Sequence, residues 1–202
     1  MKFMDALRPD LIERSSEIST RDEVLRRIAE MVSGIKDSGS TTADEIYEAL
    51  TCRESLGSTG FGHGVAIPHC RLSEAEGFMV GLITTTGGVD FDSIDGEKVR
   101  IIPFVVGPET EPKEYLKLLS AIAQLLRSSK VRKDLTAQES PADIYRYIGE
   151  QISPDDKEPR RRPGRPLRRH RRGRPDARHR RFTGRQARQE RRHVPARQTR
   201  RR

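Results

Sequence analysis

Several kinds of chemistry are excluded by what this 202-residue chain lacks. It contains only two cysteines, Cys52 and Cys70, and no C-x-x-C or H-x-x-x-H spacing that would complete a metal-ligand set. No apolar run approaches the 18 residues of a membrane-spanning helix, and the chain shows no signal peptide. We therefore expect no metal, no cofactor, no membrane span and a cytoplasmic location in which thiols stay reduced. Cys70 is expected to be a small buried thiol.

The charge of the chain is divided between an acidic body and a basic tail. The whole sequence has 39 Lys and Arg against 30 Asp and Glu, a formal charge of +9. Residues 157–202 hold 21 of these bases and only 3 acids, which leaves 18 bases and 27 acids in residues 1–156. Residues 1–152 have the size of one ordinary domain with its own core.

The tail, residues 153–202, consists mainly of Arg, Pro, Gly, His and Gln. Such a composition buries too little apolar surface to offset chain entropy, so we expect the tail to be disordered. Its R-G-R-P at 172–175 suggests nucleic-acid binding through phosphate neutralisation. An Arg-rich, nearly Lys-free segment is also what out-of-frame translation of a GC-rich gene produces. Both interpretations remain open.

Strands and helices alternate in the body, which predicts an α/β fold. Two capping boxes, T-R-D-E from Thr20 and T-A-D-E from Thr42, predict helix starts. Strands are expected at 78–85 and 99–106, and Pro103 should place the second at an edge or a bulge. A long helix is expected at 113–128, and Ser140-Pro141 should begin the last one. The buried face of the long helix is predicted to comprise Leu116, Leu119, Ile122, Ala123 and Leu126.

The most informative segment is R-E-S-L-G-S-T-G-F-G-H-G-V-A-I-P-H at 53–69. It is neither a Walker loop, since no Gly-Lys-Ser/Thr follows, nor a Rossmann fingerprint, since no strand precedes it and no helix follows. Glycine backbone can approach an anion closely, and hydroxyl and guanidinium groups donate to phosphate oxygens. The alternative to an anion-binding loop is that this segment is merely a tight connection into a buried strand at 65–67. The candidate phosphoryl-stabilising residues are Arg53, Gly57, Ser58, Thr59, Gly60, Gly62 and Gly64.

This segment resembles the active-site signature of phosphotransferase-system enzyme IIA of the fructose/mannitol type, including its nitrogen-regulatory branch. The resemblance covers about residues 5–152 and implies a mixed sheet with helices on both faces. It also implies that His69 accepts a phosphoryl group from an HPr-type carrier and passes it to a IIB domain, or keeps it as a regulatory mark. A neutral imidazole is a competent nucleophile once its other nitrogen is held protonated by an acceptor.

One departure from the family pattern concerns a second histidine, expected where this chain has Tyr115. Tyr115 is a further candidate phosphoryl-stabilising residue, because a phenol can donate one hydrogen bond to a phosphoryl oxygen. It carries no positive charge, however, so we expect phosphorylation to be slower or less complete. The alternative is that Tyr115 merely packs under the sheet. His63 is a possible secondary phosphoryl site, although a loop histidine between glycines is typically exposed and idle.

Three functions therefore compete. The first is a phosphocarrier enzyme, and the second is a regulatory binding protein whose partners depend on His69 phosphorylation. The third, nucleic-acid binding, rests on the tail alone.

Overall fold

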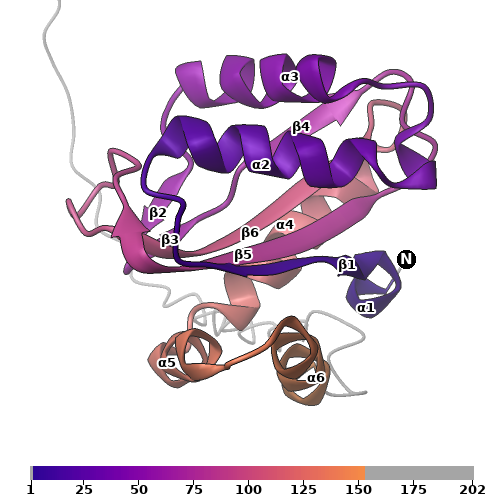
Figure 1. Ribbon diagram of the computed structural model, residues 1–202. Helices are drawn as coiled ribbons and strands as arrows, with labels where there is room; N and C mark the ends of the chain where they lie inside the picture. Colours follow the sequence, from indigo (N-terminus) through magenta and orange to yellow (C-terminus); the bar gives the residue numbers. More distant parts are fainter. Residues whose placement is uncertain (1, 153–202) are drawn as a thin grey trace, which may run out of the picture. The chain divides into compact units, whose positions relative to one another are not determined.

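Helices lie on both faces of one mixed, six-stranded sheet in the computed structural model, which describes residues 2–152 (Figure 1). This confirms the α/β class and the two-faced arrangement expected above. The expected disordered tail lies outside the described residues. In chain order the elements are α1 (Phe3–Ala6), β1 (Leu7–Ser15), α2 (Arg21–Ser33), the 3-10 helix η1 (Lys36–Ser38), α3 (Ala43–Ser55), β2 (Gly60–Gly62), β3 (Val65–Ala66), β4 (His69–Leu72), β5 (Met79–Val89), β6 (Val99–Pro108), α4 (Pro112–Leu125), α5 (Ser129–Ala137) and α6 (Pro141–Gln151).

The sheet is built around the long antiparallel pair β5 and β6. Its order is β1-β5-β6-β3-β2, and β4 also pairs with β6. Strands β3 and β4 both run parallel to β6, one after the other along the same side of it. This arrangement leaves β4, which begins with His69, with β6 as its only strand partner among the described residues.

Each face of the sheet has its own hydrophobic core. Helices α2 and α3 cover one face, where fully buried side chains such as Ile28, Ile46 and Phe104 meet. Helices α4, α5 and α6 cover the other face, with Ile122 and Ile144 at its centre. No helix of residues 2–152 is long and apolar enough to cross a bilayer.

The helix starts predicted from capping boxes are confirmed. The hydroxyls of Thr20 and Thr42 accept hydrogen bonds from the backbone of Glu23 and Glu45, and these two carboxylates bond back to the cap residues. The last helix also begins as expected, because the Ser140 hydroxyl accepts from the third helical amide. Local side-chain chemistry was sufficient to define these ends.

The expectation that Pro103 would mark an edge or a bulge is wrong. Strand β6 is internal, with β5 on one side and β3 and β4 on the other. On the latter side the Ile101 amide donates to Gly64 O and the Val105 amide to Pro68 O. Because alternate amides point the same way, Pro103 nitrogen faces the junction where β3 ends and β4 begins. The missing donor therefore costs no ladder bond there.

The predicted buried face of the long helix is also partly wrong. Leu116 is 62% exposed, whereas Tyr115 and Leu118 are buried beside Ile122. The apolar positions 115, 116, 118 and 119 allow two helical stripes, and packing against the sheet selected the one that contains Tyr115. The helix ends at Leu125 rather than 128.

Two described elements had no clear sequence signal. Strand β1 contains Pro9 and charged side chains, and its register against β5 shifts between Leu7 and Ile12. Helix α5 is short, with Val131 and Leu135 as its buried side chains.

Candidate functional site

His69 lies at the first position of β4, beside Val105 of β6. Cys70 and Leu72 point into the core beneath α2 and α3. Because side chains alternate along a strand, His69 and Arg71 face the opposite side, which α4 covers. His69 is half-buried there, and Arg71 is exposed.

Both nitrogens of the His69 imidazole have hydrogen-bond partners. Nδ1 lies 2.6 Å from the carbonyl oxygen of Ile67, and Nε of Arg53 donates to Nε2 at 2.9 Å. A carbonyl only accepts and a guanidinium only donates, so Nδ1 carries the proton and Nε2 presents its lone pair. The carbonyl acceptor expected from the sequence is thus Ile67 O.

The surroundings of His69 favour the neutral imidazole. Burial lowers its pKa most, while the bond to the Ile67 carbonyl opposes this and the Arg53 charge adds to the lowering. Both the lowering effects penalise the imidazolium form. The lone pair on Nε2 therefore stays available below the usual histidine pKa of about 6.5.

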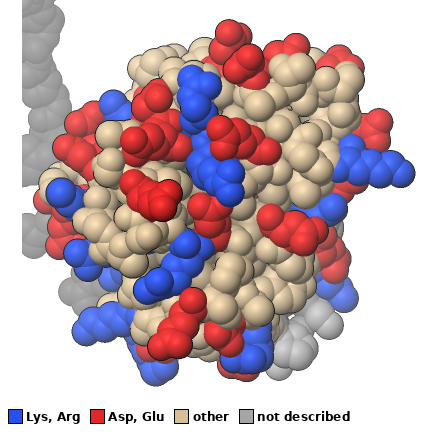
Figure 2. Space-filling model, in the orientation of Figure 1, with Lys and Arg blue, Asp and Glu red and all other residues tan. Residues whose placement is uncertain are grey.

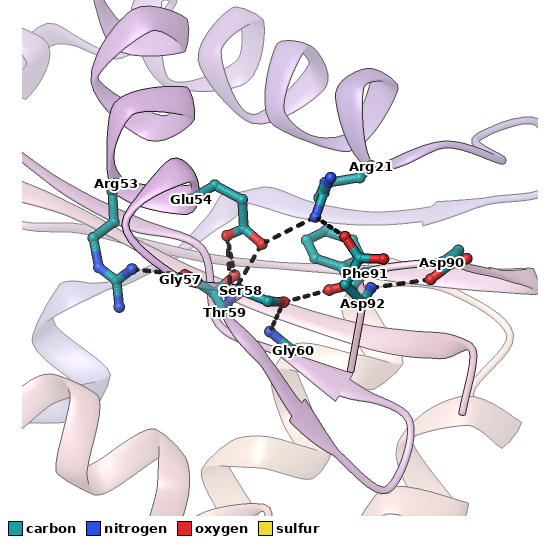
Figure 3. Close-up of polar contacts among 10 residues, drawn as sticks. All are labelled: Arg21, Arg53, Glu54, Gly57, Ser58, Thr59, Gly60, Asp90, Phe91 and Asp92. Atoms are coloured by element: carbon teal, nitrogen blue, oxygen red, sulfur yellow. Dashed lines mark hydrogen bonds and ion pairs between the residues drawn. The ribbon is translucent and has the colours of Figure 1, made fainter. Parts of the chain in front are cut away.

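Arg53 reaches His69 from the end of α3. Its Nη1 also donates to the carbonyl of Gly57, at 3.1 Å. The guanidinium is therefore fixed between the imidazole and the first glycine of the loop (Figure 3 shows the Gly57 contact). The sequence-based placement of Arg53 beside His69 agrees with this geometry.

Glu54, the next residue of α3, ties the loop down by a buried carboxylate. It accepts hydrogen bonds from the Thr59 amide, at 3.0 and 3.2 Å, and from the Thr59 hydroxyl, at 2.6 Å. Arg21 of α2 lies 3.8 Å from Glu54 and 2.8 Å from Asp92 (Figure 3). These contacts connect α2, α3, the glycine loop and the turn after β5.

The two loop hydroxyls are engaged within the protein. Thr59 donates to Glu54, and Ser58 donates to the carbonyl of Phe91 while accepting from the Gly60 amide at 3.0 Å (Figure 3). Thr59 nevertheless lies close to the site, since its carbonyl accepts from the Ile67 amide at 3.1 Å. The hydroxyls shape the loop in this structure, and their action on a phosphoryl group remains a prediction.

The structure does not gather the four glycines at one point. A Cβ at Gly60 would lie 2.6 Å from Ser93 Oγ, so this glycine permits the close approach of a neighbouring turn. Gly62 and Gly64 have φ of 91° and 74° and form the β2–β3 hairpin turn. Val65 lies opposite Ile101 of β6 and His69 opposite Val105, about 13 Å further along the strand. These last two glycines therefore serve the hairpin.

His63 occupies the same hairpin turn and is exposed. Its φ is 56°, and its amide donates to Asp95 Oδ2 at 2.6 Å. The hairpin turn precedes Val65, whose position along β6 is about 13 Å from that of His69. A role for His63 as a secondary phosphoryl site stays a prediction.

Tyr115 lies against His69. The two rings are 5.9 Å apart in an edge-on arrangement, and Tyr115 is only 8% exposed. Burial raises the pKa of its phenol. The side chain is therefore a neutral wall of the site.

Three residues in the surroundings of His69 received no role from the sequence. Ile67 acts through its backbone carbonyl, which no residue pattern reveals. Glu54 precedes the loop directly, yet its contact with Thr59 depends on the turn between them. Arg71 follows His69 by two residues, and strand alternation alone would have placed both on one face.

Cys70 is 5% exposed, as expected, and burial raises the pKa of its thiol to about 12. Cys52 is exposed. Within residues 2–152 no three His, Cys, Asp or Glu side chains cluster as a metal site would require.

Comparisons with known proteins agree with this geometry. The profile of the family described as "Phosphoenolpyruvate-dependent sugar phosphotransferase system, EIIA 2" matches residues 5–151. A nitrogen regulatory protein of Pseudomonas aeruginosa is 36% identical over 129 residues, which cover 64% of this chain and 82% of that protein. One of Bradyrhizobium diazoefficiens is 30% identical over 148 residues, 73% of this chain and 95% of that protein.

Among solved structures, nitrogen regulatory protein IIA-Ntr of Neisseria meningitidis superimposes with a TM-score of 0.67 and 28% identity. The match covers 72% of this chain and 97% of that one. The segment matched by the family profile, residues 5–151, contains the complete loop from Arg53 to His69 and the first turn of α4. The chain belongs to the type 2 enzyme IIA family of phosphoenolpyruvate-dependent sugar phosphotransferase systems.

Proposed function

We propose that Nε2 of His69 is the phosphoryl acceptor of this chain. Membership in the family makes the chain a phosphocarrier component of a phosphotransferase system. The observation that carries the assignment is the pair of hydrogen bonds on one imidazole, Nδ1 to Ile67 O and Arg53 Nε to Nε2. Together they supply a neutral nucleophile and a cation beside the nitrogen that would form the new bond.

The proposed transfer needs few groups. The Nε2 lone pair attacks the phosphorus of a phosphohistidine on an HPr-type carrier protein, and the donor P–N bond breaks as the Nε2–P bond forms. The electron pair of the broken bond returns to the donor nitrogen, and the proton stays on Nδ1 of His69, hydrogen-bonded to the Ile67 carbonyl. Arg53 then changes its partner from the lone pair to a phosphoryl oxygen, where a charge-assisted bond is stronger. The charge on the transferring group is met by preorganised donors.

The neutral Tyr115 wall supports the expectation of slower phosphorylation. A protonated histidine at position 115 would add positive charge next to the phosphoryl group, whereas the neutral phenol of Tyr115 adds none. We infer that Tyr115 lowers the rate or the extent of transfer and leaves the reaction possible.

The experiment is incubation of the full chain with phosphoenolpyruvate, enzyme I and HPr, followed by intact mass measurement. The wild type should gain one phosphoryl group, and the variant His63→Ala should gain the same. The variant His69→Ala should gain none while keeping the melting temperature of the wild type. Equal labelling of His69→Ala would end the assignment and point to His63.

A regulatory role is the second candidate. The relatives named as nitrogen regulatory proteins favour a chain whose His69 phosphorylation selects protein partners. Transfer onward to a IIB domain favours the transport role instead. Mixing the phosphorylated chain with a purified IIB domain distinguishes these roles, since only the transport role requires that the phosphoryl group pass from His69 to the IIB domain.

Nucleic-acid binding remains a proposal about the tail, which lies outside the described residues. On the face of the body shown in Figure 2, basic side chains are interspersed with acidic ones rather than gathered. Binding to duplex DNA should therefore require residues 153–202 and should weaken steeply with salt.

A further inference from the structure

Arg71, an exposed arginine of β4, lies close to the proposed phosphoryl acceptor. It lies two residues after His69 on β4, so the two Cα atoms are about 6.6 Å apart and their side chains share a face. Arg71 is exposed, and no acidic residue of the described part of the chain forms an ion pair with it. A guanidinium next to a site for a dianion is not explained by folding.

Tyr115 links Arg71 to His69. The guanidinium carbon of Arg71 lies 5.8 Å from the centre of the Tyr115 ring, and the same ring meets the His69 ring edge-on at 5.9 Å. A cation over an aromatic face is attracted by the ring quadrupole, and the attraction is modest at an exposed site. The ring therefore holds Arg71 near the imidazole without consuming its hydrogen-bond donors.

A second, electrostatic observation agrees with this placement. Burial raises the pKa of the Tyr115 phenol, and the guanidiniums of both Arg71 and Arg53 oppose that rise. Tyr115 is thus close to two cations, one from α3 and one from β4. Arg53 is already committed on one side to the Gly57 carbonyl.

We propose that Arg71 is a second guanidinium ligand of the phosphoryl group on His69, with the Tyr115 ring as its resting platform. The five donors of a guanidinium suit phosphate oxygens, so Arg71 supplies the positive charge that the buried phenol lacks. Arg53, from the end of α3, and Arg71, from β4, then both contact the group. This inference rests on the proposed function of His69 and adds a residue to it.

The test uses two phosphoryl donors of different size, the phosphorylated form of HPr and the small molecule phosphoramidate. The full chain is compared with Arg71→Ala, Arg71→Lys and the matched control Arg14→Ala, an exposed strand arginine of β1. Arg71→Ala should lower the rate of labelling by about tenfold with either donor. Arg71→Lys should recover part of the rate, because lysine keeps the positive charge but lacks the paired N–H donors of the guanidinium. Arg14→Ala should match the wild type.

Other outcomes overturn the inference in distinguishable ways. A slower reaction of Arg71→Ala with HPr alone would make Arg71 a docking residue for the carrier, because phosphoramidate offers no protein surface. Equal rates of Arg71→Ala and wild type with both donors would remove Arg71 from the site while leaving His69 in place. A wild type that neither donor labels would refute the proposed function itself.

The platform role of Tyr115 is tested by a double-mutant cycle. Tyr115→Leu removes the ring and Tyr115→Phe keeps it, so Tyr115→Leu should slow labelling by phosphoramidate more than Tyr115→Phe does. In the Tyr115→Leu background, Arg71→Ala should have a smaller effect than it has alone. Fully independent effects of the two substitutions would show that the ring does not position Arg71.

Discussion

At the scale of single residues, the protonation of His69 follows from burial and from its two hydrogen bonds. The pKa of this imidazole is lowered chiefly by burial and further by the Arg53 charge, against the raising effect of the Ile67 carbonyl. The chain therefore keeps a neutral nucleophile under conditions in which a free histidine begins to protonate.

We predict that His69 titrates below the ordinary histidine pKa of about 6.5. As the pH falls, His69 of the unfolded chain binds a proton before His69 of the folded chain does. The contribution of His69 to the free energy of unfolding therefore decreases as the pH falls from 6.5 to the folded pKa, and it is constant below that pKa. Arg53→Leu removes a neighbouring cation and should move the midpoint upward, and Arg14→Leu should not. Proton NMR of the imidazole signals measures both, and a wild-type midpoint at or above 6.5 would contradict the structural reasoning.

Tyr115→His should raise the rate of His69 phosphorylation by about fivefold, equivalent to about 1 kcal/mol. The new imidazole offers an N–H donor, and the phosphoryl group beside it favours the charged form. Labelling with phosphoramidate measures the rate, with Tyr115→Phe as the control that changes only the hydroxyl. A Tyr115→His rate equal to that of the wild type would mean that residue 115 acts by packing alone.

At the scale of elements, the site depends on how the end of α3 is joined to the loop after it. Glu54 is buried and accepts both donors of Thr59, so the loop leaves the helix along one path. That path sets the position of Gly57, which accepts from Arg53. Through the loop, Glu54 thus helps to position the cation that contacts His69.

Glu54→Ala should destabilise the domain by about 2–3 kcal/mol, because it leaves the Thr59 amide and hydroxyl buried without an acceptor. Glu54→Gln keeps an acceptor and should cost less. Urea unfolding gives the free energies, and Glu48→Ala, an exposed site on the same helix, should stay close to wild type. Stability of Glu54→Ala equal to that of Glu48→Ala would show that the loop does not depend on this contact.

At the scale of the whole molecule, both hydrophobic cores described here are assembled from residues before 153. The family profile ends at residue 151, close to the boundary that the change in composition indicates. We propose that residues 1–152 form an independent domain.

A chain ending at residue 152 should therefore melt within about 2 °C of the full chain and should be phosphorylated at the same rate. It should also lose any affinity for duplex DNA, since residues 1–152 have 18 bases against 25 acids. Calorimetry and a salt-dependent binding titration test these outcomes. A marked fall in melting temperature would show that the tail contributes to the core, and retained DNA binding would assign it to the body.

The sequence by itself determined the features that depend on neighbouring residues. Capping boxes defined the starts of α2 and α3, and the segment from Arg53 to His69 identified the family and provided the proposed phosphoryl acceptor. These signals are local, since a cap needs four residues and a loop signature needs seventeen.

Tertiary structure decided everything that requires two distant segments to meet. It placed Pro103 in an internal strand at the junction of β3 and β4, and it selected the stripe of α4 that buries Tyr115 and exposes Leu116. It also placed Gly62 and Gly64 at the β2–β3 hairpin and brought the Arg53 guanidinium to His69 and the Arg71 guanidinium to the Tyr115 ring. Such choices follow from packing and strand pairing between segments far apart in the chain, which residue spacing does not encode.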